Sequence, residues 1–238
     1  MPSQTPTRMN PMGQPIGAAL PDWTAALRPA QHRLSGDFAT LTALDPAAHG
    51  DDLFAAFLAD KTGAMWTYMP AGPFADRAAF DAELTALAHS TDPLFYAIIN
   101  PATGRAEGFA SYLRIAPDIG TIEVGWITMS PRLQRTPTAT QAMYLMMAHA
   151  FDDLGYRRYE WKCDALNAKS KAAAIRFGFQ PEGVFRQAMI YKGRNRDTAW
   201  FSILDHEWPM IKAGFERWLA PANFDANGQQ IKPLITRP

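Results

Sequence analysis

The stretch that decides the fold runs from residue 123 to residue 179 and has the sequence EVGWITMSPRLQRTPTATQAMYLMMAHAFDDLGYRRYEWKCDALNAKSKAAAIRFGF. It begins inside a predicted strand at 121–129, in which Ile122, Val124 and Trp126 share one face. A polar loop at 130–137 follows, and apolar residues at helical spacing then predict a helix over 139–154, closed by Gly155. Because free backbone amides point out of a helix start, a loop between strand and helix is a potential anion site.

The second half of this stretch predicts another strand and another helix. Residues 156–164 alternate, with Tyr159, Trp161 and Cys163 apolar and the residues between them polar. Asn167 is a typical cap for a helix over 167–177, and Ser170 lies three residues later in its first turn. A capped helix alone is an ordinary structural feature, so the functional signal lies in the order of these elements.

Strand and helix signals also alternate on either side of this stretch. Strands are predicted at 38–44, 94–99 and 108–115, and helices at 46–60 and 74–88. Turn-forming residues at 100–104 join two of the strands into a hairpin. Strands at 184–191 and 198–205 surround a turn at 192–195, and a last helix begins near Pro209. This order predicts a layered α/β fold with a mixed sheet.

The two ends of the chain differ from its middle. Residues 1–29 contain six prolines and little apolar periodicity, which predicts a loosely attached arm. Trp23 and Leu27 are candidates to hold the end of this arm on the body. Residues 220–238 are similar in character and are expected to form a tail. The single folded domain is therefore expected over 30–219.

Charge and cysteine content narrow the functional classes. The 23 basic residues balance the 23 acidic ones, so no overall field attracts nucleic acid or an anionic membrane, and neither is an expected partner. A single cysteine excludes an internal disulfide. Neither a signal peptide nor an apolar run of membrane-spanning length is recognisable in this sequence. We expect a cytoplasmic monomer or homodimer.

With this order of motifs, the chain resembles the GNAT superfamily of N-acetyltransferases, specifically their RimJ/RimL-like branch, over residues 33–208. The pyrophosphate loop of that family is Gln/Arg-x-x-Gly-x-Gly/Ala, and its later motif is Asn-x-x-Ser, a helix and Gly-Phe. A strand Glu-x-Gly precedes both. The matching residues are Glu123 and Gly125, Gln134 to Ala139, Asn167 and Ser170, and Gly178 and Phe179.

The resemblance implies a mostly antiparallel mixed sheet, flanked by helices, with splayed central strands. It also implies direct transfer of an acetyl group from acetyl-CoA to a primary amine of a small molecule, a peptide or a protein N-terminus. Glu123 is then the expected acceptor of the amine proton, and Ser170 the expected donor to the departing thiolate. The expected acetyl-CoA contacts are Ile127, Thr128, Met129, Gln134, Arg135, Thr136, Thr138, Ala139, Thr140 and Asn167.

One residue departs from the family pattern. Pro137 replaces the first loop glycine and has no N–H to donate. Proline also fits the first turn of a helix, so the loop can be preorganised by it. This departure makes a catalytically silent acyl-CoA-binding or regulatory module the alternative hypothesis. Glu123 and Ser170, present together, favour the enzyme.

The acceptor amine is expected to contact the segment at 65–70, whose aromatic residues interrupt the helical pattern. Trp66, Tyr68 and Met69 are the candidates, and an ordinary core cluster explains them equally well. The sequence alone does not separate these two interpretations.

The remaining reactive residue types carry structural predictions. Cys163 lies on an apolar strand face and is expected to be a packed core thiol. The five histidines lack ligand spacing, so no metal is predicted, and His149 is expected to be structural. Lys192, Arg194 and Arg196 are expected at a solvated hairpin tip.

Overall fold

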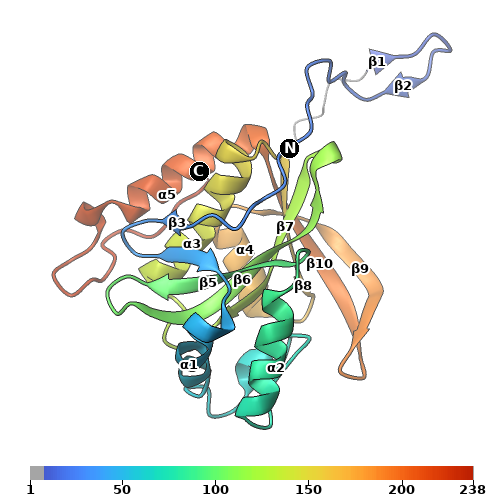
Figure 1. The fold of residues 1–238 in the computed structure, drawn as a ribbon. Coiled ribbons are helices and arrows are strands. Elements are labelled where there is room, and N and C mark those ends of the chain that lie inside the picture. The colour runs from blue at the N-terminus through green and yellow to red at the C-terminus, as the bar shows by residue number, and fades with distance from the viewer. Residues whose placement is uncertain (1–7, 238) are drawn as a thin grey trace.

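The computed structural model describes residues 8–237 and contains a sheet of eight strands with helices on both faces (Figure 1). The strand order is β3-β4-β5-β6-β7-β8-β10-β9. The strands are β3 (Leu34–Ser35), β4 (Thr40–Ala43), β5 (Leu94–Asn100), β6 (Arg105–Ala116), β7 (Thr121–Met129), β8 (Arg158–Asp164), β9 (Gln180–Tyr191) and β10 (Arg194–Leu204). The helices are α1 (Pro46–Phe57), α2 (Arg77–Ala88), α3 (Pro137–Ala148), α4 (Ala168–Arg176) and α5 (Trp208–Leu219).

The central strands β7 and β8 separate toward their carboxyl ends. They form the parallel pair of an otherwise antiparallel sheet, and their pairing runs from Thr121 opposite Arg158 to Val124 opposite Trp161. Beyond that point β7 continues to Met129 and β8 to Asp164 without pairing to each other. This splay confirms the predicted sheet.

A β-bulge marks the place where β7 leaves β8. Phe109 and Ser111 of β6 are two residues apart, but their partners Thr128 and Gly125 on β7 are three apart. Trp126 takes up the extra residue with a left-handed φ of 50°. Bulges bend and twist a strand, so this one directs the end of β7 away from β8.

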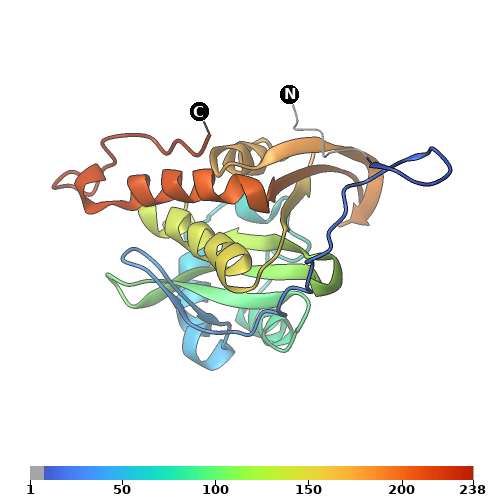
Figure 2. The same cartoon turned by 90° about the horizontal axis from the view of Figure 1, so that it is seen from above.

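Each face of the sheet has its own hydrophobic core. Helices α3 and α5 lie on the same side of the sheet (Figure 2). Together with α4 they contribute to the larger core, which also contains Tyr159, Trp161 and Cys163 of β8. Helices α1 and α2 cover β5 and β6 on the other face, with Phe57 and Phe80 in the smaller core. The alternation predicted for 156–164 therefore holds, and the polar residues of β8 face the side that carries α1 and α2.

Several element boundaries differ from the predicted ones for local reasons. Helix α3 begins at Pro137 because the hydroxyl of Thr136 accepts from the backbone N–H of Ala139 at 3.1 Å. It ends at Ala148 and is followed by a π-helical turn at His149–Asp153, so the predicted helix over 139–154 is two elements. Helix α2 begins at Arg77, because Asp76 caps it. Strand β9 begins at Gln180, earlier than predicted.

The N-terminal segment is held by its later residues. The hairpin of β1 (Arg8–Met9) and β2 (Pro15–Ile16) projects from the body in both views (Figures 1 and 2). Trp23 donates from Nε1 to the carbonyl of Asp118 at 3.1 Å, and the backbone N–H of Leu27 donates to Leu154 at 2.8 Å. Both candidates therefore attach the arm, Leu27 through its backbone.

The C-terminal segment packs on the body, which corrects the expectation of a loose tail. The hydroxyl of Thr236 donates to the carbonyl of Arg176 at 3.2 Å, and Arg237 donates from Nε to that of Gly178 at 2.7 Å. A Cβ at Gly214 would lie 2.4 Å from the carbonyl oxygen of Ile235, so only glycine permits this close approach of α5. Within residues 8–237, no helix has the length and apolarity that crossing a membrane requires.

Candidate active site

The loop between β7 and α3 presents backbone amides at the start of a helix. Among the described residues, no acceptor is found for the N–H groups of Arg135, Thr136 and Thr138. Arg135 adopts a left-handed φ of 64°, which turns the loop just before the helix begins. Such amides at a positive helix end are the chemistry that a pyrophosphate requires.

The structure shows what the other predicted loop residues do. The amide of Ala139 is capped by the Thr136 hydroxyl, and that of Thr140 donates to the Thr136 carbonyl at 3.2 Å. Gln134 donates from Nε2 to the carbonyl of Met129 at 2.9 Å, which fixes the loop to the end of β7. Pro137 occupies the first position of α3, where its missing N–H costs the helix nothing.

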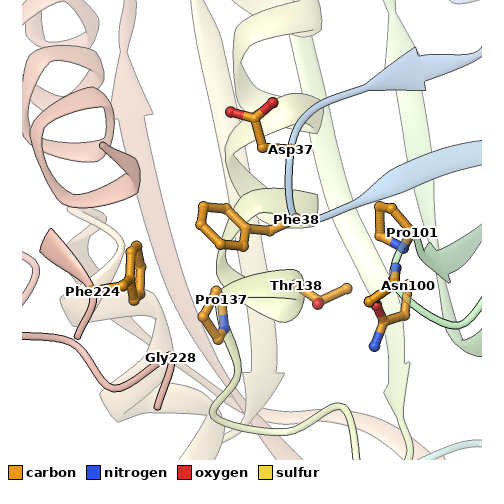
Figure 3. Close-up of a pocket in the computed structure, with 9 residues that line it drawn as sticks. Asp37, Phe38, Asn100, Pro101, Pro137, Thr138, Phe224 and Gly228 are labelled. Atoms are coloured by element: carbon orange, nitrogen blue, oxygen red, sulfur yellow. Dashed lines mark hydrogen bonds between the residues drawn. The ribbon is translucent and has the colours of Figure 1, made fainter. Parts of the chain in front are cut away.

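A cavity of about 250 Å³ lies beside the start of α3 (Figure 3). Phe38, Phe224 and Pro137 line it, and the two phenylalanine rings lie 5.0 Å apart between centroids. Asn100 at the end of β5 is also part of the cavity wall, so the cavity lies on the β5 side of α3. The splay, in contrast, lies between β7 and β8. The cavity therefore adjoins the loop before α3 and is separate from the splay.

Ser170 is presented by the start of α4 on the same face as α3. Its hydroxyl accepts from Nε1 of Trp161 at 2.9 Å, and Trp161 is the last residue of β8 that pairs with β7. Asn167 caps α4 by accepting from the backbone N–H of Ser170 at 3.1 Å. Asn167 and Ser170 thus lie together at the point where β7 and β8 separate.

Glu123 belongs to a ladder of charged side chains that crosses the sheet. Its Oε2 accepts from Arg114 of β6 at 2.5 Å and from Lys162 of β8 at 2.8 Å. Lys162 also reaches Glu160 at 2.7 Å, and Arg158 bonds Glu160 at 2.6 Å. Although burial opposes it, the two cations lower the pKa of Glu160.

The surroundings of Glu123 are tightly packed. The side chains of Glu123 and Lys162 are each 4% exposed. A Cβ at Gly125 would lie 2.9 Å from Leu113 and 3.5 Å from Oε1 of Glu123, so Glu123 and Gly125 share a face, as predicted. The sequence did not reveal Arg114 and Lys162 as partners of Glu123, although the polar alternation of 156–164 placed Lys162 on this face.

The segment at 65–70 has some side chains in the smaller core and one that extends away from it. Trp66 is buried in the smaller core, with its ring edge-on to those of Phe57 and Phe74. Met69 packs against the same core. Tyr68 instead extends across the chain, and its hydroxyl donates to the carbonyl of Leu166 at 3.2 Å. Trp66 therefore has the core position, while Tyr68 adjoins the end of the splay.

The tip of the β9–β10 hairpin is not simply solvated, which corrects the prediction for two of its cations. Lys192 donates to the carbonyls of Trp66 at 2.8 Å and of Gly72, and Arg194 donates to that of Thr67 at 2.8 Å. Burial lowers the pKa of Lys192. The hairpin tip thus holds the 65–73 segment in place next to the splay.

Cys163 and His149 have the structural positions that the sequence predicted. Cys163 lies in the larger core, and burial raises the pKa of its thiol. His149 is 6% exposed and bonds Asp153 at 2.8 Å. The described part of the chain contains no group of three or more His, Cys, Asp or Glu residues arranged to hold a metal ion.

The comparisons with known proteins identify the family. The acetyltransferase (GNAT) domain family matches residues 40–180 of the sequence. The chain therefore belongs to the GNAT acetyltransferases. A GCN5-related N-acetyltransferase from Brucella melitensis is 47% identical in sequence, with a TM-score of 0.88. That match covers 90% of this chain and 97% of the other. The sheet of eight strands with flanking helices is accordingly the GNAT fold.

Two further likenesses are more limited. The putative ribosomal N-acetyltransferase YdaF of Bacillus subtilis is 32% identical over 69 residues, 29% of this chain and 38% of that protein. The chain spans about half the length, or less, of the curated relatives it matches. The microcin C7 self immunity acetyltransferase MccE, solved in complex with acetyl-CoA and AMP, is 22% identical with a TM-score of 0.61, covering 71% of this chain and 93% of MccE. At that identity the likeness concerns the fold.

Proposed function

We propose that this protein is an acetyl-CoA-dependent N-acetyltransferase of the RimJ/RimL-like branch, acting on a primary amine in the cytoplasm as a monomer or homodimer. The observation that carries the proposal is the splay of β7 and β8 beside the free amides of Arg135, Thr136 and Thr138. The fold that it shares with MccE, a protein solved with acetyl-CoA, and the partial match to YdaF support the co-substrate and the branch.

The reaction is a direct transfer between two substrates. The amine nitrogen forms a bond to the acetyl carbonyl carbon, the carbon–sulfur bond breaks, and CoA leaves as the thiol. The proton lost by the amine balances the one gained by sulfur. We assign the pyrophosphate to the loop before α3, and the pantetheine and thioester to the β7 edge at 127–129, where pairing to β8 has ended. Asn167 would border the pantetheine arm.

Glu123 and Ser170 lie on opposite faces of the sheet at the splay, and their proposed roles match these positions. Ser170 lies with α4 on the face that carries the acetyl-CoA loop, from which it can donate to the thiolate. Glu123 lies on the face of α1 and α2, from which an amine would approach. Of the three expected acceptor contacts, Tyr68 has the position that best suits an acceptor, because it reaches the end of β8 through Leu166.

Binding of CoA should stabilise the protein against heat. At a CoA concentration about 100 times its Kd, mass action adds roughly 2.7 kcal/mol. For a chain of this size that corresponds to a rise in Tm of roughly 5–10 °C. Pantetheine, which lacks the pyrophosphate, should stabilise far less. If millimolar CoA caused neither a thermal shift nor heat in calorimetry, the acetyl-CoA site would be wrong.

A further inference from the structure

Strand β10 carries a row of polar side chains on the face of the sheet where Glu123 lies. Arg196, Thr198 and Trp200 occupy alternate positions, so they point to the same side. Nζ of Lys162, the partner of Glu123, lies 3.6 Å from the centroid of the Trp200 ring, which fixes that side. The intervening Ala199 and the following Phe201 are buried in the larger core on the opposite face.

Each member of this row has a buried polar atom without a hydrogen-bond partner in the described chain. The atoms are Nε of Arg196, Oγ1 of Thr198 and Nε1 of Trp200. Thr198 is 4% exposed. A buried polar atom left unpaired costs roughly 1–3 kcal/mol, so three in one row on one strand call for an explanation. Two of them are N–H donors, and they suit the oxygen atoms of a ligand.

A carboxylate of complementary charge lies next to this row. Asp164 is the last residue of β8, is 5% exposed and is directly opposite Thr198. Its two oxygens accept from the Tyr191 hydroxyl and from the backbone N–H of Leu166, each at 2.8 Å. Within residues 8–237, no lysine or arginine forms an ion pair with it.

Tyr191 lies between the Asp164 carboxylate and the Arg196 guanidinium and contacts both. Burial and the bond to Asp164 raise the pKa of its hydroxyl, so it stays a donor. The guanidinium of Arg196 lies 5.8 Å from the centroid of the Tyr191 ring. Tyr191 therefore contacts both Asp164 and Arg196, and Thr198, the residue directly opposite Asp164, lies between them on β10 and brings the row to the carboxylate.

The position of this cluster relative to the splay suits an acceptor. Asp164 lies three residues beyond Trp161, where pairing between β7 and β8 ends. Tyr68 bonds the carbonyl of Leu166, two residues after Asp164, and so brings the 65–70 segment to the same place. An amine held at Asp164 would thus lie at the open end of the splay, on the face opposite Ser170. It would be four residues along β8 from Glu160, the residue opposite Glu123, so its proton would reach Glu123 through water.

We propose that Asp164, Tyr191, Arg196, Thr198 and Trp200 form the acceptor subsite. The acceptor is a primary amine whose neighbouring carbon carries an acyl group. This acyl group is either a carboxylate or a peptide carbonyl. Asp164 binds the amine, and the β10 row binds the oxygen. This inference rests on the proposed acetyl transfer and adds the chemical class of its acceptor.

The test compares matched acceptors that differ only at the carboxyl group, which is present as the acid, present as the amide, or absent. Acetylation of the amino acids that have a primary α-amine, of their amides and of the corresponding decarboxylated amines would be followed by thiol release and by mass detection of product. We expect kcat/KM to be roughly 10- to 100-fold higher for the best acid or amide than for its decarboxylated amine. Preference for the acid would identify free amino acids, and preference for the amide would identify peptide N-termini.

Two variants connect this preference to the row. Arg196→Gln and Thr198→Val should each reduce the preference about tenfold, by raising the KM of the acid or amide with kcat little changed. Thr198→Val keeps the shape of the side chain, so it remains informative if Arg196→Gln does not fold. Arg186→Gln, on the exposed neighbouring strand, is the control and should leave the preference unchanged.

The outcomes separate this inference from the proposed function. Equal acetylation of acids and decarboxylated amines by the wild-type protein would overturn the subsite while leaving acetyl transfer in place. So would an equal loss for both acceptors in Arg196→Gln. If the protein bound CoA but acetylated no amine at all, the proposed function would fail, and the subsite with it.

Discussion

Replacing Glu123 by glutamine is expected to lower turnover by roughly 10²–10⁴-fold, the usual cost of losing a general base. Glutamine keeps the shape of the side chain but cannot take a proton from the amine. Binding of acetyl-CoA should hardly change, because the pyrophosphate loop lies on the other face of the sheet. The measurements are turnover across pH and CoA binding by calorimetry.

The ion pairs of Glu123 make a matched control necessary. Arg114 and Lys162 both bond its carboxylate, and removing one partner of a buried ion pair costs stability. Glu160→Gln removes a bond to the same Lys162 without changing the residue near Gly125. We expect Glu160→Gln to lower Tm while turnover per folded molecule is kept. If the two variants lost stability alike and both kept their turnover and pH profile, Glu123 would be a structural member of the ladder.

The sequence was sufficient for part of the architecture around the splay. The predicted common face of Ile122, Val124 and Trp126 is wrong, because the first two lie in the larger core and Trp126, at the bulge, packs against the smaller one. The alternation of residues 156–164 depends on a local period of two, which the fold preserves, so the core face of β8 was predictable. The separation of β7 from β8 came from the resemblance to the GNAT family. The bulge that produces it is local to Trp126, but no sequence signal marks a left-handed φ at a tryptophan.

The side-chain partners within the site were not predictable in the same way. Lys162 meets Glu123 from β8 and Trp200 from β10, so its environment depends on strand register between distant segments. The polar row on β10 also depends on the pairing of Thr198 with Asp164. The order of the motifs predicts which strands carry the site, whereas the fold decides which polar residues of those strands meet.

The packing of the C-terminal segment was missed for a related reason. Its composition resembles that of the N-terminal arm, yet Thr236 and Arg237 bond carbonyls at the end of α4. Gly214 was the available signal, because a glycine inside an otherwise helical pattern often permits close approach of another backbone.

Replacing Ser170 by alanine is expected to lower turnover roughly 10²–10³-fold, comparable to the loss of one donor to developing negative charge. The Ser170 oxygen accepts from Nε1 of Trp161, and that bond leaves the hydroxyl hydrogen to donate to a sulfur, either that of the neighbouring Cys163 or that of CoA. The positive end of α4 further favours negative charge there. Because the interaction strengthens mainly as the carbon–sulfur bond breaks, acetyl-CoA binding should weaken much less than turnover falls.

If Ser170 had only a structural role, Ser170→Ala would lose stability and keep its turnover. The contacts of Ser170 indicate how large that loss of stability should be. Asn167 caps α4 through the backbone N–H of residue 170, which alanine retains. The variant then loses the bond from Trp161, worth about 1 kcal/mol of stability. Trp161→Phe loses the same bond but keeps the serine hydroxyl, so it measures that cost separately. If Ser170→Ala and Trp161→Phe had similar melting temperatures and both kept wild-type turnover, the hydroxyl would have no part in the departure of CoA.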